Sequence, residues 1–370
     1  MKVSYRISAL YIWIFSVFLH LPFDAGLTQT FSRAEFRTHL QQAAAAADTL
    51  QIEQLLNQQR GEAIRFIESL LDSTVHKRAA GDATAARNDW QTAKIVADVY
   101  QQIFGDDFYR VKAIRFRQLM PDQLSVKAQV LQLKDQATQD FYQGEFRAAL
   151  DKFQQALPLA VRINDVDERA AIVGNIGAAY FYLGEFDKAL DYYRQSLTLL
   201  EALGDRRRIG NRLGNIATLY NDKSDYPTAL AYYEKAMAIR RELDDQRGLA
   251  ADLNNAGLIY EEMGNYDLAL AKYQSALEIN QTIGNERSAA KNLANIANVH
   301  INLGDYPEAL GIYEKILPIR KDREDRKGEG NDLGNMGIAY QSLGDYDLAM
   351  RHYQNALSIH REIGFKEGEA

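Results

Sequence analysis

The 370-residue sequence contains no cysteine, which excludes disulfides, thiolate metal sites and cysteine nucleophiles. It also lacks an excess of basic charge, since 43 Lys and Arg face 50 Asp and Glu for a net charge of -7. A nucleic-acid binder normally carries a basic face, so we expect no nucleic-acid partner. The six histidines show no metal-ligand spacing, and no glycine-rich loop ends in Lys-Ser/Thr. We therefore expect no cofactor and no catalytic activity.

The first residues differ in composition from the remainder of the chain. Lys2 and Arg6 precede an apolar run over 7–21, and Pro22 ends that run. A short apolar run after basic residues is typical of a secretory signal, and this one is shorter than a membrane-spanning helix of about 20 residues. We expect 1–26 to be a signal peptide or an uncleaved signal anchor, and the protein to be exported (periplasmic, extracellular or membrane-anchored). The alternative is a buried N-terminal helix in a cytoplasmic protein.

The sequence repeats with a period of 40 residues, without a gap, from residue 130 onward. Counted from the first residue of each unit, position 20 is always alanine, position 24 is aromatic, and position 8 is alanine or glycine. Six copies in phase indicate a repeat architecture. The six units are 130–169, 170–209, 210–249, 250–289, 290–329 and 330–369.

Each unit has the pattern of a helical hairpin. Position 15 is glycine in five units and Ser224 in the third unit, and an Asp, Glu or Asn follows it in all six. Glycine ends a helix in a left-handed conformation, and an acidic or amide side chain can cap the next one. Pro227 and Pro307 fall in the first turn of the second helix, where a missing N–H costs little. The small residues at positions 8 and 20 allow the two helices to approach closely. We predict twelve antiparallel helices over 130–363, without a strand.

These positions resemble the signature of the tetratricopeptide-repeat (TPR) family. Units of 40 residues with an asparagine before the small residue are similar to those of kinesin light chain, of the spindle adaptor LGN and of long bacterial arrays. The resemblance implies an all-α fold, a right-handed α-solenoid (superhelix) of helix-turn-helix repeats. It also implies that the first helices line a concave groove that binds a protein or an extended peptide.

Residues 27–129 read as helical but do not keep the 40-residue phase. Gly81-Asp82 and Gly105-Asp106 are typical of turns between helices. We interpret 27–129 as a helical N-terminal cap of degenerate repeats, because the end of a solenoid needs a cover. The alternative is a separate small helical module.

Asparagine recurs at position 6, on the first helix and away from the apolar stripe. Asparagine is a mediocre helix former, so its repetition inside a helix needs a cause. Its amide offers both a donor and an acceptor, so a row of amides along the groove can pair with the backbone of a peptide. The alternative is that each asparagine bonds to the neighbouring unit and fixes the pitch. The five residues are Asn175, Asn215, Asn255, Asn295 and Asn335. In the first unit Asp135 replaces the asparagine, and the row ends there.

Further polar residues are expected in the same groove. Position 2 contributes Asn211, Lys291 and Asn331, position 12 contributes Asn221, Glu261 and Gln341, and position 13 contributes Asn302. This mixed surface lacks the regular Lys/Arg row of the TPR clamps that bind chaperone tails.

The sequence therefore predicts a non-catalytic scaffold for a protein or peptide. Two alternatives stay open: an N-terminal sensor or adaptor region of a larger enzyme, CHAT protease-like or histidine kinase, or a structural solenoid that assembles with itself. The final helix carries Met350, Tyr353, Leu357 and Ile359, some of which should lack a neighbouring repeat. We expect further chain, a second copy or a partner to cover this C-terminal face. We expect membrane contact only through an uncleaved N-terminal anchor.

Overall fold

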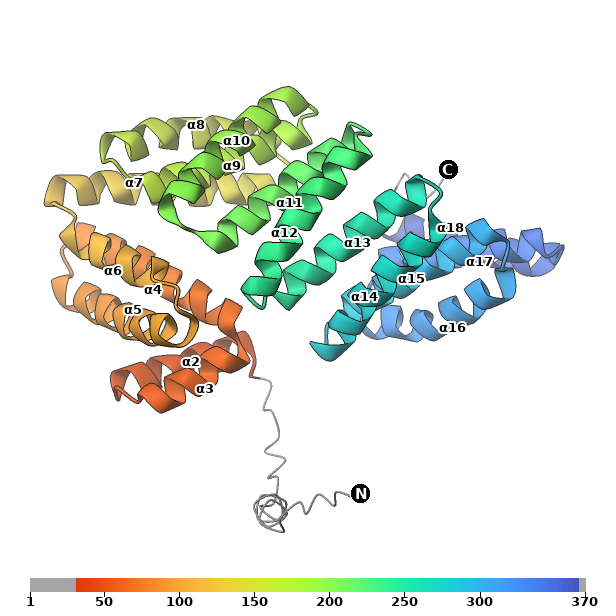
Figure 1. Ribbon diagram of the computed structural model, residues 1–370, viewed down its shortest axis with the longest axis horizontal. Coiled ribbons are helices and arrows are strands. Elements are labelled where there is room, and N and C mark those ends of the chain that lie inside the picture. The colour runs from red at the N-terminus through yellow and green to blue at the C-terminus, as the bar shows by residue number, and fades with distance from the viewer. Residues whose placement is uncertain (1–30, 366–370) are drawn as a thin grey trace, which may run out of the picture. The chain divides into compact units, whose positions relative to one another are not determined.

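The computed structural model describes residues 31–365, which contain helices and turns but no strand (Figure 1). The predicted signal segment lies outside the described residues. The described chain divides into two compact units: 31–71 with 87–113, and 72–86 with 114–365. Within 31–365, no helix is both long and apolar enough to cross a membrane.

The first unit contains two whole helices and parts of three others. These are α2 (Arg33–Ala45), α3 (Thr49–Gln58), α4 (Arg60–Ala79), α5 (Ala83–Phe104) and α6 (Phe108–Gln118). The predicted turns are confirmed, because Gly81 and Gly105 separate helices with φ of 85° and 68°. Whether this region acts as a cap or as a separate module stays a prediction.

From Pro121 onward the described chain forms twelve helices, as predicted. Each packs on the next, and the first helices of neighbouring units also touch, as in α11 with α13 and in α13 with α15. The all-α solenoid is thereby confirmed. The helices are α7 (Pro121–Tyr142), α8 (Phe146–Arg162), α9 (Val166–Tyr182), α10 (Phe186–Leu203), α11 (Arg206–Asp222), α12 (Tyr226–Glu242), α13 (Gln246–Glu262), α14 (Tyr266–Thr282), α15 (Glu286–Leu303), α16 (Tyr306–Asp322), α17 (Arg326–Ser342) and α18 (Tyr346–Glu362).

The turn inside each hairpin has the predicted left-handed residue, with φ from 58° at Ser224 to 83° at Gly144. The predicted cap after that residue is only partly right. Asp225 and Asp345 accept a hydrogen bond from a backbone N–H of the second helix. The other four residues make no such bond: Glu145, Glu185, Asn265 and Asp305. The regular caps instead occur at position 36, before each first helix, and were not predicted; they are Asp165, Asp205, Asp245, Asn285 and Asp325.

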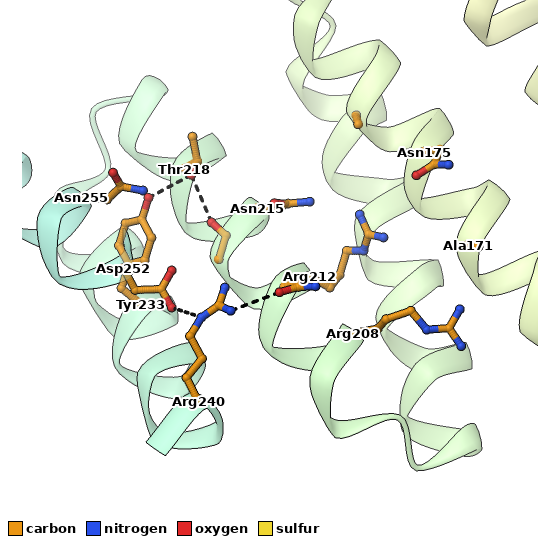
Figure 2. Close-up of a pocket in the computed structure, with 13 residues that line it drawn as sticks. Ala171, Asn175, Arg208, Arg212, Asn215, Thr218, Tyr233, Arg240, Asp252 and Asn255 are labelled. Carbon is orange, nitrogen blue, oxygen red and sulfur yellow. Dashed lines mark hydrogen bonds and ion pairs between the residues drawn. The ribbon is translucent and has the colours of Figure 1, made fainter. Parts of the chain in front are cut away.

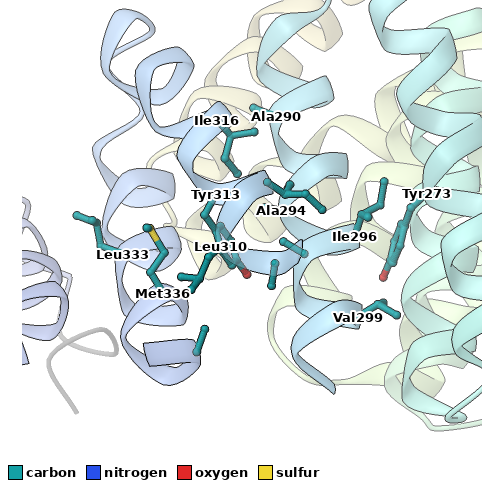
Figure 3. Close-up of a cluster of buried hydrophobic side chains, with 14 of the residues drawn as sticks. Tyr273, Ala290, Ala294, Ile296, Val299, Leu310, Tyr313, Ile316, Leu333 and Met336 are labelled. Atoms are coloured by element: carbon teal, nitrogen blue, oxygen red, sulfur yellow. The ribbon is translucent and has the colours of Figure 1, made fainter. Parts of the chain in front are cut away.

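Small residues bring the two helices of a hairpin into contact, as predicted. The alanines at position 20 are all buried, and Tyr233, Tyr273 and Tyr313 at position 24 are at most 2% exposed. Figure 3 shows Tyr273 and Tyr313 within one apolar cluster that also holds Ile296. A Cβ added to Gly257 would lie 2.6 Å from the Tyr273 ring, so the ring would have to shift if a larger residue replaced this glycine. Close packing at these positions sets the geometry of each hairpin.

The junctions between units contain buried side chains that match one another. Position 31, on the second helix of one unit, pairs with position 3, on the first helix of the next. The first pair is apolar, since it consists of Ala160 and Ile172, and both residues are fully buried. The three polar pairs are Arg240–Asp252, Asn280–Asn292 and Arg320–Asp332, with N–O distances of 2.5, 2.8 and 3.0 Å.

Position 36 completes each polar pair. Arg240 Nη1 donates to Asp245 at 2.8 Å, and the Asn285 amide donates to Asn280 at 3.2 Å. Arg320 donates in the same way to Asp325. The same three positions therefore hold either an arginine with two aspartates or three asparagines, and each set satisfies its own hydrogen bonds.

The last helix, α18, is less covered than its counterparts. Tyr353 is half-buried, whereas the equivalent tyrosines in the four preceding units are buried. Met350 is 58% exposed, Leu357 is half-buried and Ile359 is 6% exposed. What covers this face stays a prediction.

The junction sets lead to a stability prediction. Arg320→Asn leaves Asp332 buried without a cation, so we expect it to lower the free energy of unfolding by about 3 kcal/mol. Arg320→Asn with Asp325→Asn and Asp332→Asn recreates the asparagine set and should recover most of that loss. Urea unfolding of the full chain, followed by circular dichroism, measures both.

The control is the exposed pair Arg323–Glu286, whose side chains are 53% and 56% exposed. Its double asparagine variant should change stability by at most about 1 kcal/mol. A triple junction variant no more stable than Arg320→Asn would contradict the matching rule.

Candidate functional site

Three of the five predicted asparagines line one cavity of about 470 Å3 on the first helices α9, α11 and α13. These are Asn175, Asn215 and Asn255, and Asn211 joins them (Figure 2). Asn215 is exposed, whereas Asn175 and Asn255 are half-buried. The Asn175 amide makes no hydrogen bond to any residue in 31–365. The structure thus brings together the first three asparagines of the predicted row.

The other two asparagines of the row bond to a neighbouring unit. The Asn295 amide donates to Asn254 Oδ1 at 2.8 Å, and the Asn335 amide donates to Asn298 Oδ1 at 2.8 Å. Asn254 also accepts from Asn292 at 2.9 Å, so the amides form a network across α13 and α15. These bonds match the structural alternative for Asn295 and Asn335, and a binding role for these two stays a prediction.

Most of the additional predicted groove residues lie away from this cavity. Asn211 is exposed and accepts from Arg240 Nη1 at 3.1 Å. Glu261 accepts from the Tyr273 hydroxyl at 2.7 Å and from Asn302 at 3.1 Å. The remaining four are Lys291 and Asn331, which are exposed, Gln341, which accepts from Tyr353 at 2.8 Å, and Asn221, whose Oδ1 is buried without a donor in 31–365.

The charged residues of the cavity were not predicted. They are Arg208, Arg212, Arg240 and Asp252. Arg240 lies between Asp252, Asp245 and Asn211. The signal that could have found Arg212, Arg240 and Asp252 is the pairing of positions 31 and 3, which carry different residue types in successive units.

Arg208 is held by two carboxylates. Its side chain donates to Asp205 and to Asp167, which are both buried. Burial alone would lower the pKa of Arg208, but the two carboxylates outweigh it and raise that pKa above its ordinary value. Arg208 and Arg240 are therefore neutralised within the protein.

Arg212 is in a different environment. Its Nη1 donates to the carbonyl oxygen of Gly174 at 3.2 Å, and its guanidinium lies 5.1 Å from the centre of the Tyr193 ring. With the Asn215 amide turned to satisfy both of its groups, the amide oxygen accepts from Nη1 at 3.3 Å. The Nε atom is buried without a hydrogen-bond partner, and no carboxylate in 31–365 pairs with the side chain. Burial lowers the pKa of Arg212 to about 10, and Arg208 adds to this effect.

The chemistry of the cavity favours binding. Its lining contains no histidine, lysine or serine, and its one carboxylate, Asp252, is held by Arg240. The Thr218 hydroxyl is bonded to the Gly214 carbonyl and to the Tyr233 hydroxyl. Within 31–365 no group of three side chains could hold a metal ion. Amides and guanidinium groups remain, and these recognise backbone and acidic groups.

The repeat units of this chain match a known protein family. A sequence model of the family described as tetratricopeptide repeat matches residues 130–202, 210–282 and 287–362. No curated protein matches the chain.

Solved structures share the fold at low sequence identity. BtubC (BKLC) from P. vanneervenii is 20% identical, with 64% of this chain and 92% of that chain covered and a TM-score of 0.51. The STAND protein with a tetratricopeptide repeat sensor from Pyrococcus horikoshii is 13% identical, with 91% and 52% covered and a TM-score of 0.59. Aspartyl phosphate phosphatase F from Bacillus subtilis is 12% identical, with 89% and 92% covered and a TM-score of 0.51. These similarities show the fold alone.

The buried carboxyl of Asp252 leads to a pH prediction. Burial raises the pKa of Asp252 from 3.8 to about 6, in spite of Arg240. Between these values the folded chain holds a proton that the unfolded chain releases. The free energy of unfolding should therefore fall with rising pH in this window, by up to about 1.4 kcal/mol per pH unit from this group. Asp252→Asn should lose that contribution, as measured by urea unfolding from pH 4 to 6.5.

The control is Asp187→Asn. Asp187 bonds to Lys223, which lowers its pKa, so its removal should leave the slope above about pH 5 unchanged. Parallel stability curves for the wild-type chain and Asp252→Asn would contradict the prediction.

Proposed function

The chain belongs to the tetratricopeptide-repeat family, and from that membership we propose that it is a scaffold without catalytic activity that binds an extended peptide segment of a partner protein. The observation that carries the proposal is the set of three asparagine amides on α9, α11 and α13, which line one cavity. They recur at one position in successive units, so a peptide that follows the groove meets them in turn. Each amide can donate to a backbone carbonyl and accept from a backbone N–H.

The bonding state of these amides supports a role in binding. The Asn175 amide has no partner in 31–365, whereas Asn255 receives a long hydrogen bond of 3.4 Å from Asn254 and also interacts with the Tyr233 hydroxyl. Asn295 and Asn335, in contrast, already donate to neighbouring units. The free hydrogen-bonding capacity is therefore concentrated at the cavity, which is where we place the ligand.

The absence of catalysis is part of the proposal. The fold does not decide it, because one structure with this fold is described as a phosphatase. What supports it is the cavity lining, where Thr218 is committed to internal hydrogen bonds and Asp252 to Arg240. No nucleophile with an adjacent base is left in the lining.

A second candidate function is that of a sensor region in a larger signalling protein. The chain spans about half of the STAND protein from Pyrococcus horikoshii, whose tetratricopeptide repeats are described as a sensor. A peptide ligand would then control an attached domain, such as a CHAT protease-like or histidine kinase domain. Export from the cytoplasm also stays a proposal, because residues 1–26 lie outside the described range.

The test is the triple variant Asn175→Ala, Asn215→Ala and Asn255→Ala. Decapeptides selected on the wild-type chain from a random library should bind this variant at least tenfold more weakly, because three backbone contacts are lost. The helical circular dichroism signal should stay unchanged, since alanine is a better helix former than asparagine and the variant removes only one contact with a neighbouring repeat, that of Asn255 with Tyr233.

The matched control is Asn295→Ala with Asn335→Ala. These amides hold neighbouring units together, so the double variant should unfold at a lower urea concentration and bind the peptides normally below it. If the triple variant binds with wild-type affinity, or if the library yields no binding peptide, the proposed function is wrong.

A further inference from the structure

The side chains at positions 31 and 3 match each other at four of the five repeat junctions, but not at the junction between the second and third units. Positions 31 and 3 are matched at Ala160–Ile172, Arg240–Asp252, Asn280–Asn292 and Arg320–Asp332. At the junction between the second and third units, the same positions hold Leu200 and Arg212. Leu200 is 1% exposed and offers no polar group. An arginine therefore occupies a junction that has no partner for its charge.

The surrounding backbone is shaped to hold this arginine. A Cβ added to Gly174 would lie 1.8 Å from Nη2 of Arg212, so a larger residue at this position would displace the guanidinium from its present place. Glycine inside a helix costs about 1 kcal/mol relative to alanine. Asn175 follows Gly174 directly, and Figure 2 shows the Arg212 guanidinium between the Asn175 and Asn215 amides. The charge is thus placed between the first two amides of the predicted row.

An unmatched charge in this place is unfavourable for the free protein. A half-buried cation whose partners are all neutral groups loses part of its hydration, and an incoming anion can offset that loss. Isoleucine at this position would recreate the apolar Ala160–Ile172 junction at no such cost. A cost of this kind, set in a cavity, is typical of a binding residue.

We propose that Arg212 is the receptor for a carboxylate of the bound peptide, which enters the cavity between Asn175 and Asn215. This inference rests on the proposed function and adds a sequence preference to it: the amides read the backbone, and Arg212 selects an acidic residue or a free C-terminus. A guanidinium can bind both oxygens of a carboxylate with parallel hydrogen bonds.

The charge balance favours a carboxylate over a phosphate group. Arg208 already forms ion pairs with Asp167 and Asp205. Arg240 already forms ion pairs with Asp245 and Asp252. Arg212 is the one cation of the described cavity lining whose charge is not matched. One positive charge matches a singly charged carboxylate, whereas a phosphate group carries nearly two negative charges.

The experiment uses the full chain and acetylated decapeptides selected as binders. In one series each peptide has an amidated C-terminus and a single Asp, Asn or phosphoserine at one scanned position, so that the Asp and Asn peptides form a carboxylate and amide pair. In a second series the peptide has no acidic residue, and its free C-terminus is compared with the amidated form. Fluorescence anisotropy gives the affinities. At the peptide position that contacts Arg212, the carboxylate peptide should bind at least tenfold more tightly than its amide twin. If Arg212 binds the C-terminus instead, the peptide with the free C-terminus should exceed its amidated twin by the same factor.

The variant Arg212→Ile should lose this discrimination, so that the two twins bind within twofold of each other, while its melting temperature stays equal or rises. Arg212→Lys should keep part of the discrimination, because lysine keeps the positive charge but lacks the two parallel N–H donors of the guanidinium. The matched control is Arg241→Gln, which removes an exposed charge from α12 and should keep the full ratio.

The outcomes separate this inference from the proposed function. If the peptides bind but the twins do not differ, the inference is wrong and the amide groove stands. Tighter binding of the phosphoserine peptide would identify a phosphate receptor and overturn the assignment. If no peptide binds, the proposed function fails, and titration with sodium acetate decides on Arg212. Its Nε–H signal, identified by its loss in Arg212→Ile, should shift with acetate, and an unshifted signal would overturn the carboxylate site.

Discussion

A polar side chain buried between two repeats must be satisfied by the adjoining unit, because water cannot reach it there. This constraint is met at three junctions, α12 with α13, α14 with α15 and α16 with α17. An arginine at position 31 faces an aspartate at position 3, and an asparagine faces an asparagine, as in Arg240–Asp252 and Asn280–Asn292. Since position 36 is both the helix cap and a member of the set, the same contacts begin each first helix and fix it on the preceding unit.

The constraint also separates structural from available polar groups. Asn295 and Asn335 are bonded to the adjoining unit, whereas the Asn175 amide is bonded to no residue in 31–365. Arg212 breaks the junction rule in the same cavity that Asn175 lines. Unsatisfied amides and an unmatched charge thus occur together, where the first helices of three units meet.

Much of the fold could be predicted because its determinants recur in every unit. Position 15 carries the turn and position 20 carries the close contact, so six copies gave a consistent pattern. The site could not be predicted in the same way. Position 3 is Ile172, Arg212, Asp252, Asn292 and Asp332 in turn, and its meaning appears only against position 31. Asn295 and Asn215 occupy equivalent positions, and only Asn254, present in one unit, explains why Asn295 is buried.

The account makes one central claim, that the ligand lies along the first helices α9, α11 and α13. Hydrogen–deuterium exchange of the full chain, with and without the tightest library peptide, tests it most directly. We expect slower exchange in the central turns of these three helices, around Asn175, Asn215 and Asn255, with the second helices α10, α12 and α14 unchanged. Slower exchange confined to the second helices, or to α18, would place the ligand elsewhere and contradict the account.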